Sequence, residues 1–432
     1  MTLQKASITE NVSFSWINTD KFKTGALTLT VSMPLDEKDY LHSLILAGVM
    51  RRGTKNMPSM ALINRRLDDL YAATVDIQSV IHGQVLCFTV SAEFLNGRFA
   101  IDGTDIAGGV ISVIADILTS PLTDGDCFPE PCVRSERGVV RDSLASEKNN
   151  TRLYAATRLK ELMSRGGNPH FPRLEYLLAE VERVSPADVF AFYQKLISLP
   201  ISVFYVGAED SESIRCALER EFSSWGCGAA PQASSPCAER ACEYLSVVED
   251  MSVNQGKLCM GWRTGAVIGT RESAVAVVLN EIFGASPASK LFLNVRERLG
   301  LCYYCSSSYS LLSGNLTVSC GIDPSRREQA HSEILAALEQ IKRGNISEAE
   351  FDAAKRSLEY NYVQIYDSPF ALQSFYSVRD TFGISQSVEQ CKEAILSVTR
   401  EEVVALANRM TYDTCFFLNG TNTDAGEEDT DE

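Results

Sequence analysis

Alternating and helix-like patterns of apolar residues divide the chain into two similar series of elements. In the first half, A-L-T-L-T-V predicts a strand over residues 26–31, and the apolar stretch at 40–50 predicts a helix. In the second half, K-L-C-M-G-W predicts a strand over 257–262, and residues 272–283 predict the helix after it. The two halves therefore begin in the same way.

The resemblance between the halves continues through a glycine and a second helical pattern. The sequence M-A-L-I-N-R-R-L-D-D-L-Y-A follows Gly53, and K-L-F-L-N-V-R-E-R-L-G-L-C-Y follows Gly284. A constant offset of 231 positions places Gly53 on Gly284 and Arg65 on Arg296. This shared order favours an internal duplication.

Each half also ends with a capping box, a helix and a strand. Ser185 with Asp188 opens one such helix, and Thr399 with Glu402 opens the other. In a capping box the hydroxyl accepts from a free helix N–H, and the acid three residues later accepts from the cap residue. Strands are expected after these helices, at 201–206 and 414–418.

Strands, long helices and hairpin-like stretches at 75–92 and 306–321 alternate within each half. We therefore predict an α+β protein made of two homologous α/β-sandwich halves related by a pseudo-twofold axis. Each half would have a mostly antiparallel sheet with helices on one face. The predicted domains are 1–221 and 243–420, with a linker at 222–242, rich in small residues, Gly and Pro, and an acidic disordered tail at 421–432.

Composition narrows the function classes. The chain has 432 residues, which fits two domains, and a net charge of −16, which disfavours nucleic-acid binding. No run of apolar residues is long enough to span a membrane, and the N-terminus lacks the apolar core of a signal peptide. The 13 cysteines are scattered and odd in number, so we expect reduced thiols and a cytoplasmic location.

Four segments carry a family resemblance. They are L-I-L-A-G-V-M-R-R-G-T (44–54), S-E-R-G-V-V-R-D-S-L (135–144), residues 168–193, and G-A-S-P-A-S-K-L-F-L-N-V-R-E-R-L-G-L-C-Y-Y (284–304). Together they resemble the pitrilysin/insulinase family of zinc peptidases, the inverzincins, over nearly the whole chain. The resemblance implies the insulinase-like (LuxS/MPP-like) fold. The opening F-K-T-G-A-L-T-L-T-V and R-R-G-T-K-N-M-P-S-M further resemble a bacterial zinc-less subgroup, some of whose members are named for association with elongation factor P modification.

The resemblance also identifies what is missing. In the family, H-x-x-E-H on a helix supplies two zinc ligands and the general base, and a later glutamate supplies the third ligand. The matching positions here are Leu44, Ala47, Gly48 and Ser143, none of which can serve. We therefore expect no bound metal and no cofactor. His42 lies near the motif but does not restore it in any register, and we expect it to be a partly exposed surface residue.

A second part of the family's site is retained. Arg296 and Tyr303 match an arginine–tyrosine pair spaced seven residues apart. In the family this pair reaches the zinc site, where tyrosine can donate to the oxyanion and arginine can hold the peptide. We expect Arg296 at a helix end and Tyr303 at the start of a strand, with Tyr304 pointing to the opposite face. Without the surrounding motif, we would interpret Arg296 as a surface charge on a helix and Tyr303 as an aromatic residue of a strand.

These features favour a non-catalytic subunit of a heterodimeric zinc peptidase. It would bind peptide and supply Arg296 and Tyr303 in trans to a zinc-bearing partner, as some family members do. The alternative is a peptide- or protein-binding scaffold without peptidase activity, and a third hypothesis is an enzyme with a new site. The sequence leaves open whether a homodimer forms instead, and it does not identify the substrate.

The sequence also contains a C-x-x-C motif at Cys302 and Cys305. No βαβ pattern surrounds it and no second C-x-x-C accompanies it, so the motif does not favour a redox or metal role. On a regular strand, residues three apart face opposite sides of the sheet. We therefore expect these two thiols to point away from each other.

Overall fold

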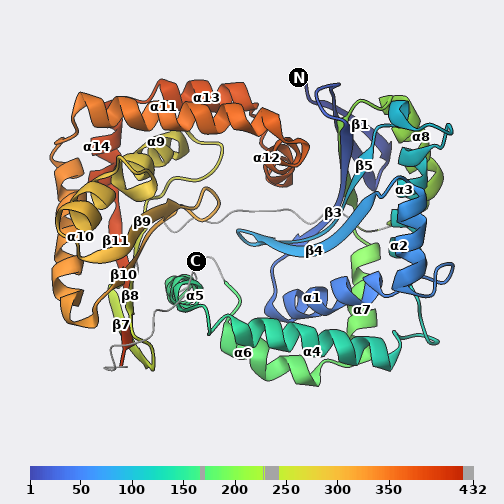
Figure 1. Cartoon of the computed structure of the whole chain (residues 1–432), viewed down its shortest axis with the longest axis horizontal. Coiled ribbons are helices and arrows are strands. Elements are labelled where there is room, and N and C mark those ends of the chain that lie inside the picture. Colours follow the sequence, from blue (N-terminus) through green and yellow to red (C-terminus); the bar gives the residue numbers. More distant parts are fainter. Residues whose placement is uncertain (166–170, 227, 229–242, 422–432) are drawn as a thin grey trace. The chain divides into compact units, whose positions relative to one another are not determined.

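A computed structural model describes residues 1–165, 171–226, 228 and 243–421 (Figure 1). The chain forms two compact units, and each is assembled from three segments. Unit 1 comprises Met1–Leu144, Pro172–Ser234 and Tyr366–Gly383. Unit 2 comprises Ala145–Phe171, Ser235–Ile365 and Ile384–Glu432.

Unit 1 contains a six-stranded sheet. Its strands are β1 (Gln4–Thr9), β2 (Val12–Asn18), β3 (Thr24–Pro34), β4 (Thr74–His82), β5 (Val85–Leu95) and β6 (Ile201–Gly207). The strand order is β1-β2-β6-β3-β5-β4, and only β2 and β6 are parallel. The predicted hairpin at 75–92 is the β4–β5 pair.

Unit 2 contains a five-stranded sheet with an equivalent order. Its strands are β7 (Leu245–Met251), β8 (Gly256–Arg263), β9 (Cys302–Tyr309), β10 (Asn315–Ile322) and β11 (Thr411–Gly420). The order β7-β11-β8-β10-β9 matches β2-β6-β3-β5-β4, including the single parallel pair β7–β11. The shared topology supports the predicted duplication and the α+β class.

Helices pack on both sheets. In unit 1 they are α1 (Glu37–Arg51), α2 (Met60–Asp69), α3 (Ile106–Thr119), α4 (Glu130–Ser146), α6 (Leu174–Glu180), α7 (Pro186–Ile197), α8 (Ser211–Phe222) and α12 (Pro369–Thr381). In unit 2 they are α5 (Thr151–Met163), α9 (Arg271–Asn280), α10 (Arg327–Lys342), α11 (Glu348–Gln364), α13 (Val388–Leu396) and α14 (Arg400–Arg409). Short 3₁₀ turns lie at Gly97–Phe99, Val181–Arg183, Pro324–Arg326 and Ile365–Asp367, and π-helical segments at Glu281–Ala285 and Leu291–Arg298.

Both faces of the unit 2 sheet are covered, which the sequence did not predict. All eight residues of β8 are buried. Met260 and Trp262 on one face join the core formed with α9, α10 and α14. Gly261 faces α5 on the other side, where an added Cβ would overlap the side chain of Met163.

The covering helix in each unit comes from the other half of the sequence. Helix α5 precedes the linker but packs on β8 and β11, and α12 follows it but packs on β6 and β3. In unit 1, Gln373 of α12 donates from Nε2 to the carbonyl of Phe204 at 2.8 Å. The units therefore group the segments differently from the predicted halves 1–221 and 243–420, because each sheet buries its second face with an exchanged helix.

The predicted capping boxes are confirmed. The Ser185 hydroxyl accepts from the Asp188 N–H at 3.2 Å, and Asp188 accepts from the Ser185 N–H at 3.0 Å. Thr399 and Glu402 form the same pair at 3.2 and 2.8 Å. These contacts start α7 and α14 where the sequence placed them.

Two predicted segments fall mainly or wholly outside the described residues. They are most of the linker at 222–242 and all but the first residue of the tail at 421–432. No helix in the described part of the chain is both long and apolar enough to cross a lipid bilayer.

Candidate functional site

The degenerate zinc motif lies on α1, as predicted. The Asp36 carboxylate starts this helix by accepting from the N–H groups of Lys38 and Asp39 at 2.9 and 3.1 Å. Ala47 is buried, and Leu44 is partly buried. Neither side chain carries a donor atom for a metal, so this face of α1 offers only hydrocarbon and backbone.

A glutamate side chain takes the space that a histidine at position 48 would need. A Cβ added to Gly48 would overlap the carboxylate of Glu136 on α4. That carboxylate accepts from Arg52 at 2.5 Å, and Arg52 also donates to the Ser135 hydroxyl at 2.7 Å. The place of the zinc-binding side chain is thus filled by an ion pair that joins α1 to α4.

The fourth predicted position is equally unsuited to a metal. Ser143 lies on α4, two turns after Glu136, and is exposed. Among the described residues, the only group of three or more His, Cys, Asp or Glu side chains placed to share a metal lies elsewhere, in unit 2. The structure places Leu44, Ala47 and Gly48 on α1 and Ser143 on α4.

The prediction for His42 is wrong. The residue is buried, with 6% of its surface exposed, and its ring meets Phe192 of α7 edge-on at 6.3 Å between centroids. Burial lowers the pKa of His42, while Asp188 opposes that shift. His42 is buried because α7 packs over this turn of α1, a contact between segments far apart in the sequence.

Arg296 and Tyr303 lie on consecutive elements of unit 2. Arg296 is in the π-helical segment Leu291–Arg298, with its guanidinium 4.8 Å from the Phe292 ring centroid and 3.6 Å from the Glu297 carboxylate. Tyr303 is the second residue of β9, and 80% of its surface is exposed. Arg296 is also substantially exposed, so both polar groups can reach a molecule outside this chain.

A β-bulge explains the exposure of Tyr303. In the β9–β10 pairing, Tyr304 is opposite Gly321 and Cys302 is opposite Ile322, which leaves Tyr303 as the extra residue. Bulges bend a strand and redirect a side chain. Tyr304 points the other way, as predicted: burial raises the pKa of its phenol, and the Arg152 guanidinium lies 4.2 Å from its ring centroid.

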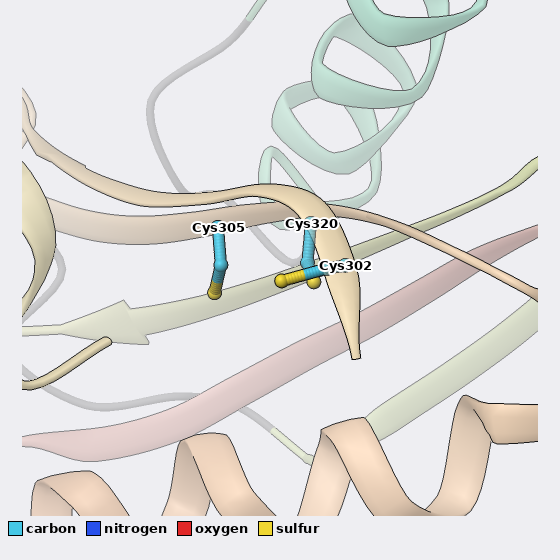
Figure 2. Close-up of side chains that lie close together, drawn as sticks. All are labelled: Cys302, Cys305 and Cys320. Atoms are coloured by element: carbon cyan, nitrogen blue, oxygen red, sulfur yellow. The ribbon is translucent and has the colours of Figure 1, made fainter. Parts of the chain in front are cut away.

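The same bulge makes the prediction for the C-x-x-C motif wrong. Cys302 and Cys305 do not point to opposite faces: their sulfurs and that of Cys320 all lie within 4.8 Å of one another (Figure 2). Skipping Tyr303 in the pairing moves Cys302 to the face that carries Cys305. Sequence reasoning missed Cys320 because nothing in the linear spacing links it to the motif.

The two equivalent sheets and an α1 helix without metal-binding side chains fit a homologue of a two-domain zinc peptidase that lacks the zinc motif. The family model described as "Peptidase M16 inactive domain" matches residues 183–358, which include the segment with Arg296 and Tyr303. The chain is 26% identical to a probable inactive metalloprotease, YmfF, of Bacillus subtilis over 94% of this chain and 95% of that protein. The chain is thus a homologue of the peptidase M16, or pitrilysin/insulinase, family, similar to members that are described as inactive.

A further relative matches part of the chain, and solved structures share its fold. An uncharacterized zinc protease of Bacillus subtilis, YmxG, is 27% identical over 36% of this chain and 39% of its own length. A conserved protein from Enterococcus faecalis has the same fold, with a TM-score of 0.88 and 24% identity over 98% of this chain and all of that one. A peptidase M16 inactive domain from Pseudomonas fluorescens superposes with a TM-score of 0.76 and 15% identity over 99% and 100% of the two chains.

Proposed function

We propose that this chain is the non-catalytic subunit of a heterodimeric zinc peptidase. It would bind the peptide and supply Arg296 and Tyr303 to the zinc site of its partner. The proposal rests above all on the bulge that turns Tyr303 outward with 80% of its surface exposed. Burying a large side chain stabilises a fold by about 1.5–3 kcal/mol, which this geometry forgoes, so we infer that the phenol is kept for a contact outside the chain.

The chemistry of the pair suits a peptidase transition state. A carbonyl attacked by zinc-bound water develops negative charge, and an exposed tyrosine hydroxyl can donate to it. The neighbouring Arg296 can hold a peptide carbonyl or carboxylate by charge-assisted hydrogen bonds. The zinc itself would come from the partner, since Leu44, Ala47 and Gly48 offer no ligands.

The edge of the unit 2 sheet supports peptide binding. Strand β9 is the last strand in the order β7-β11-β8-β10-β9, and Tyr303 lies at its start. An extended peptide can add to an edge strand through main-chain hydrogen bonds. We propose that such a peptide would pass Tyr303. We also propose a cytoplasmic location, on the basis of the scattered, odd set of cysteines.

The test begins with affinity purification of the tagged full chain from its own organism. The expected result is recovery of a second chain that bears H-x-x-E-H and a downstream glutamate. The purified pair is then assayed on an unstructured peptide with Arg296→Ala and Tyr303→Phe. Tyr303→Phe should lower kcat by about 100- to 1,000-fold, as the loss of one oxyanion donor does. Arg296→Ala should weaken peptide binding and so lower kcat/KM. Neither change should separate the subunits.

Arg298→Ala and Tyr360→Phe serve as matched controls. Arg298 is exposed on the same π-helical segment as Arg296, and Tyr360 is an exposed tyrosine of α11, 63% accessible. Both should retain full activity. If the Arg296 and Tyr303 variants cleave peptide as fast as the controls, the in-trans role is refuted. Recovery of a stable peptide or protein complex that contains no zinc peptidase would instead favour the scaffold function.

A further inference from the structure

Three cysteine side chains of unit 2 come together although they are not adjacent in sequence. Cys305 of β9 lies directly opposite Cys320 of β10, and the bulge at Tyr303 brings Cys302 to the same side. Figure 2 shows the three side chains on neighbouring strands with their sulfur atoms grouped. Each sulfur is within 4.8 Å of the other two.

This spacing is close to that of a metal–thiolate centre. Three sulfurs placed about 2.3 Å from one ion in a plane stand about 4 Å apart. The observed sulfurs lie within 4.8 Å of one another, at most about 0.8 Å beyond that spacing, so small rotations about the side-chain bonds would close the site.

The surroundings separate this group from ordinary buried cysteines. Cys305 and Cys320 lie in the hydrophobic core, with 4% and 0% of their surfaces exposed, whereas Cys302 is partly accessible at the start of the edge strand. Single buried cysteines usually behave as small apolar residues. Cys259 on the other face of the same sheet has that character: burial raises the pKa of its thiol to about 12, and its sulfur lies 3.7 Å from the Ser319 hydroxyl. Three thiols within 4.8 Å of one another form instead a polar, soft-ligand site.

The three cysteines differ in their distance from solvent. Cys302 is the first residue of the edge strand β9 and is partly accessible, whereas Cys305 and Cys320 are buried in the core. Cys302 is therefore the member of the group that a cation would meet first.

We propose that Cys302, Cys305 and Cys320 bind one thiophilic metal ion in three-coordinate geometry, and that the ion is Cu(I). Soft thiolates select Cu(I), zinc and iron–sulfur clusters. Structural zinc is almost always four-coordinate, and no fourth His, Cys, Asp or Glu joins this group among the described residues. A trigonal set of three sulfurs meets the preference of Cu(I) without another ligand.

Binding is an exchange of protons for the metal, with no electron transfer. One Cu⁺ replaces up to three thiol protons, which leave to solvent, and the centre then carries a charge of −2. The proposal is independent of the peptidase role, because it assigns no function to Tyr303 and its test does not measure peptide cleavage.

The test uses the full chain, reduced, freed of metal by chelation and kept without oxygen. It is titrated with tetrakis(acetonitrile)copper(I) against a competing Cu(I) chelator. Uptake is followed by thiolate-to-copper absorption and by elemental analysis. One equivalent of tightly bound copper is expected for the native chain. Cys302→Ser should weaken binding by more than the 10- to 100-fold typical of losing a second-shell partner.

Cys259→Ser is the matched control, because this cysteine is buried in β8 of the same sheet but lies outside the group. It should bind copper like the native chain. Cys302→Ser is preferred to Cys320→Ser because its partly exposed position tolerates the change, and circular dichroism verifies its fold. Equal copper binding by Cys302→Ser, or one-to-one zinc binding that copper does not displace, would overturn the proposal. So would a disulfide between two of the three sulfurs that forms in place of metal uptake.

Discussion

At the scale of single residues, the Glu136 side chain fills the space that a Cβ at position 48 would need. Alanine in a helix interior is favoured over glycine by about 1 kcal/mol, but a Cβ at position 48 overlaps the Glu136 carboxylate. We predict that Gly48→Ala lowers the free energy of unfolding by about 1 kcal/mol, because Glu136 must leave Arg52. In a Glu136→Ala background the same change should raise it by up to about 1 kcal/mol. Urea unfolding of the four proteins measures the difference.

Gly138 supplies the control for this cycle. It lies in α4, and nothing stands within 4 Å of a Cβ added there. Gly138→Ala should stabilise the chain by about 0.5–1 kcal/mol whether or not Glu136 is present. If Gly48→Ala changed the free energy of unfolding equally with and without the Glu136 side chain, the overlap with Glu136 would not affect stability.

His42 gives a second residue-scale prediction, on pH. Burial lowers its pKa in the folded chain below the ordinary value of 6.5. The unfolded chain then binds the proton more readily, so stability rises with pH in this window and is lost as pH falls through about 6.5. We expect His42→Gln to show a smaller loss of unfolding free energy between pH 7.5 and pH 5.5 than the native chain. If the variant and the native chain lost the same unfolding free energy between these two pH values, His42 would titrate alike in the folded and the unfolded chain.

At the scale of elements, a buried ion pair attaches α5 to the unit 2 sheet. Asp413 of β11 is fully buried and accepts from Arg263 of β8 at 2.5 Å, and Arg165, just after α5, lies 2.8 Å from it. Arg263 also donates to the carbonyl of Met163 at the end of α5. We predict that Asp413→Asn lowers the free energy of unfolding by about 3–5 kcal/mol, because it leaves buried arginine charge unpaired.

An exposed pair tests whether this cost comes from burial. Asp367 pairs with Lys21 at 2.6 Å, but 65% and 42% of the two side chains are exposed. Asp367→Asn should change stability by less than about 1 kcal/mol in the same denaturant titration. Similar costs for the two changes would contradict the role assigned to Asp413.

Local sequence patterns predicted most of the helices and strands, but they did not predict the β-bulge at Tyr303. The capping boxes at Ser185 and Thr399 depend on contacts three residues apart, so the sequence alone located α7 and α14. The bulge at Tyr303 depends on how β9 pairs with β10, a partner that the C-x-x-C motif does not contain. For this reason the retained tyrosine could be found by resemblance, while the three-cysteine group could not be found from spacing.

At the scale of the whole molecule, the exchange of α5 and α12 was equally hidden. The apolar patterns correctly gave two similar halves, and the composition break at 222–242 suggested a clean boundary. The pattern of a strand such as β8 reports that both of its faces are buried but not which helix covers each one. Helix α5 precedes the linker in the sequence but belongs to unit 2, so sequence order alone could not assign it to that unit.

The exchange predicts that the two sequence halves depend on each other to fold. Residues 1–228 and 243–432, produced together as separate chains, should elute as one complex in size-exclusion chromatography, because the first chain holds α5 and the second holds the β8 strand that it covers. Produced alone, each should aggregate with an apolar sheet face uncovered. Gly261→Val, which overlaps Met163 of α5, should weaken the complex about tenfold or more, or about 1.4 kcal/mol. Two folded monomers that elute separately would refute the interdependence.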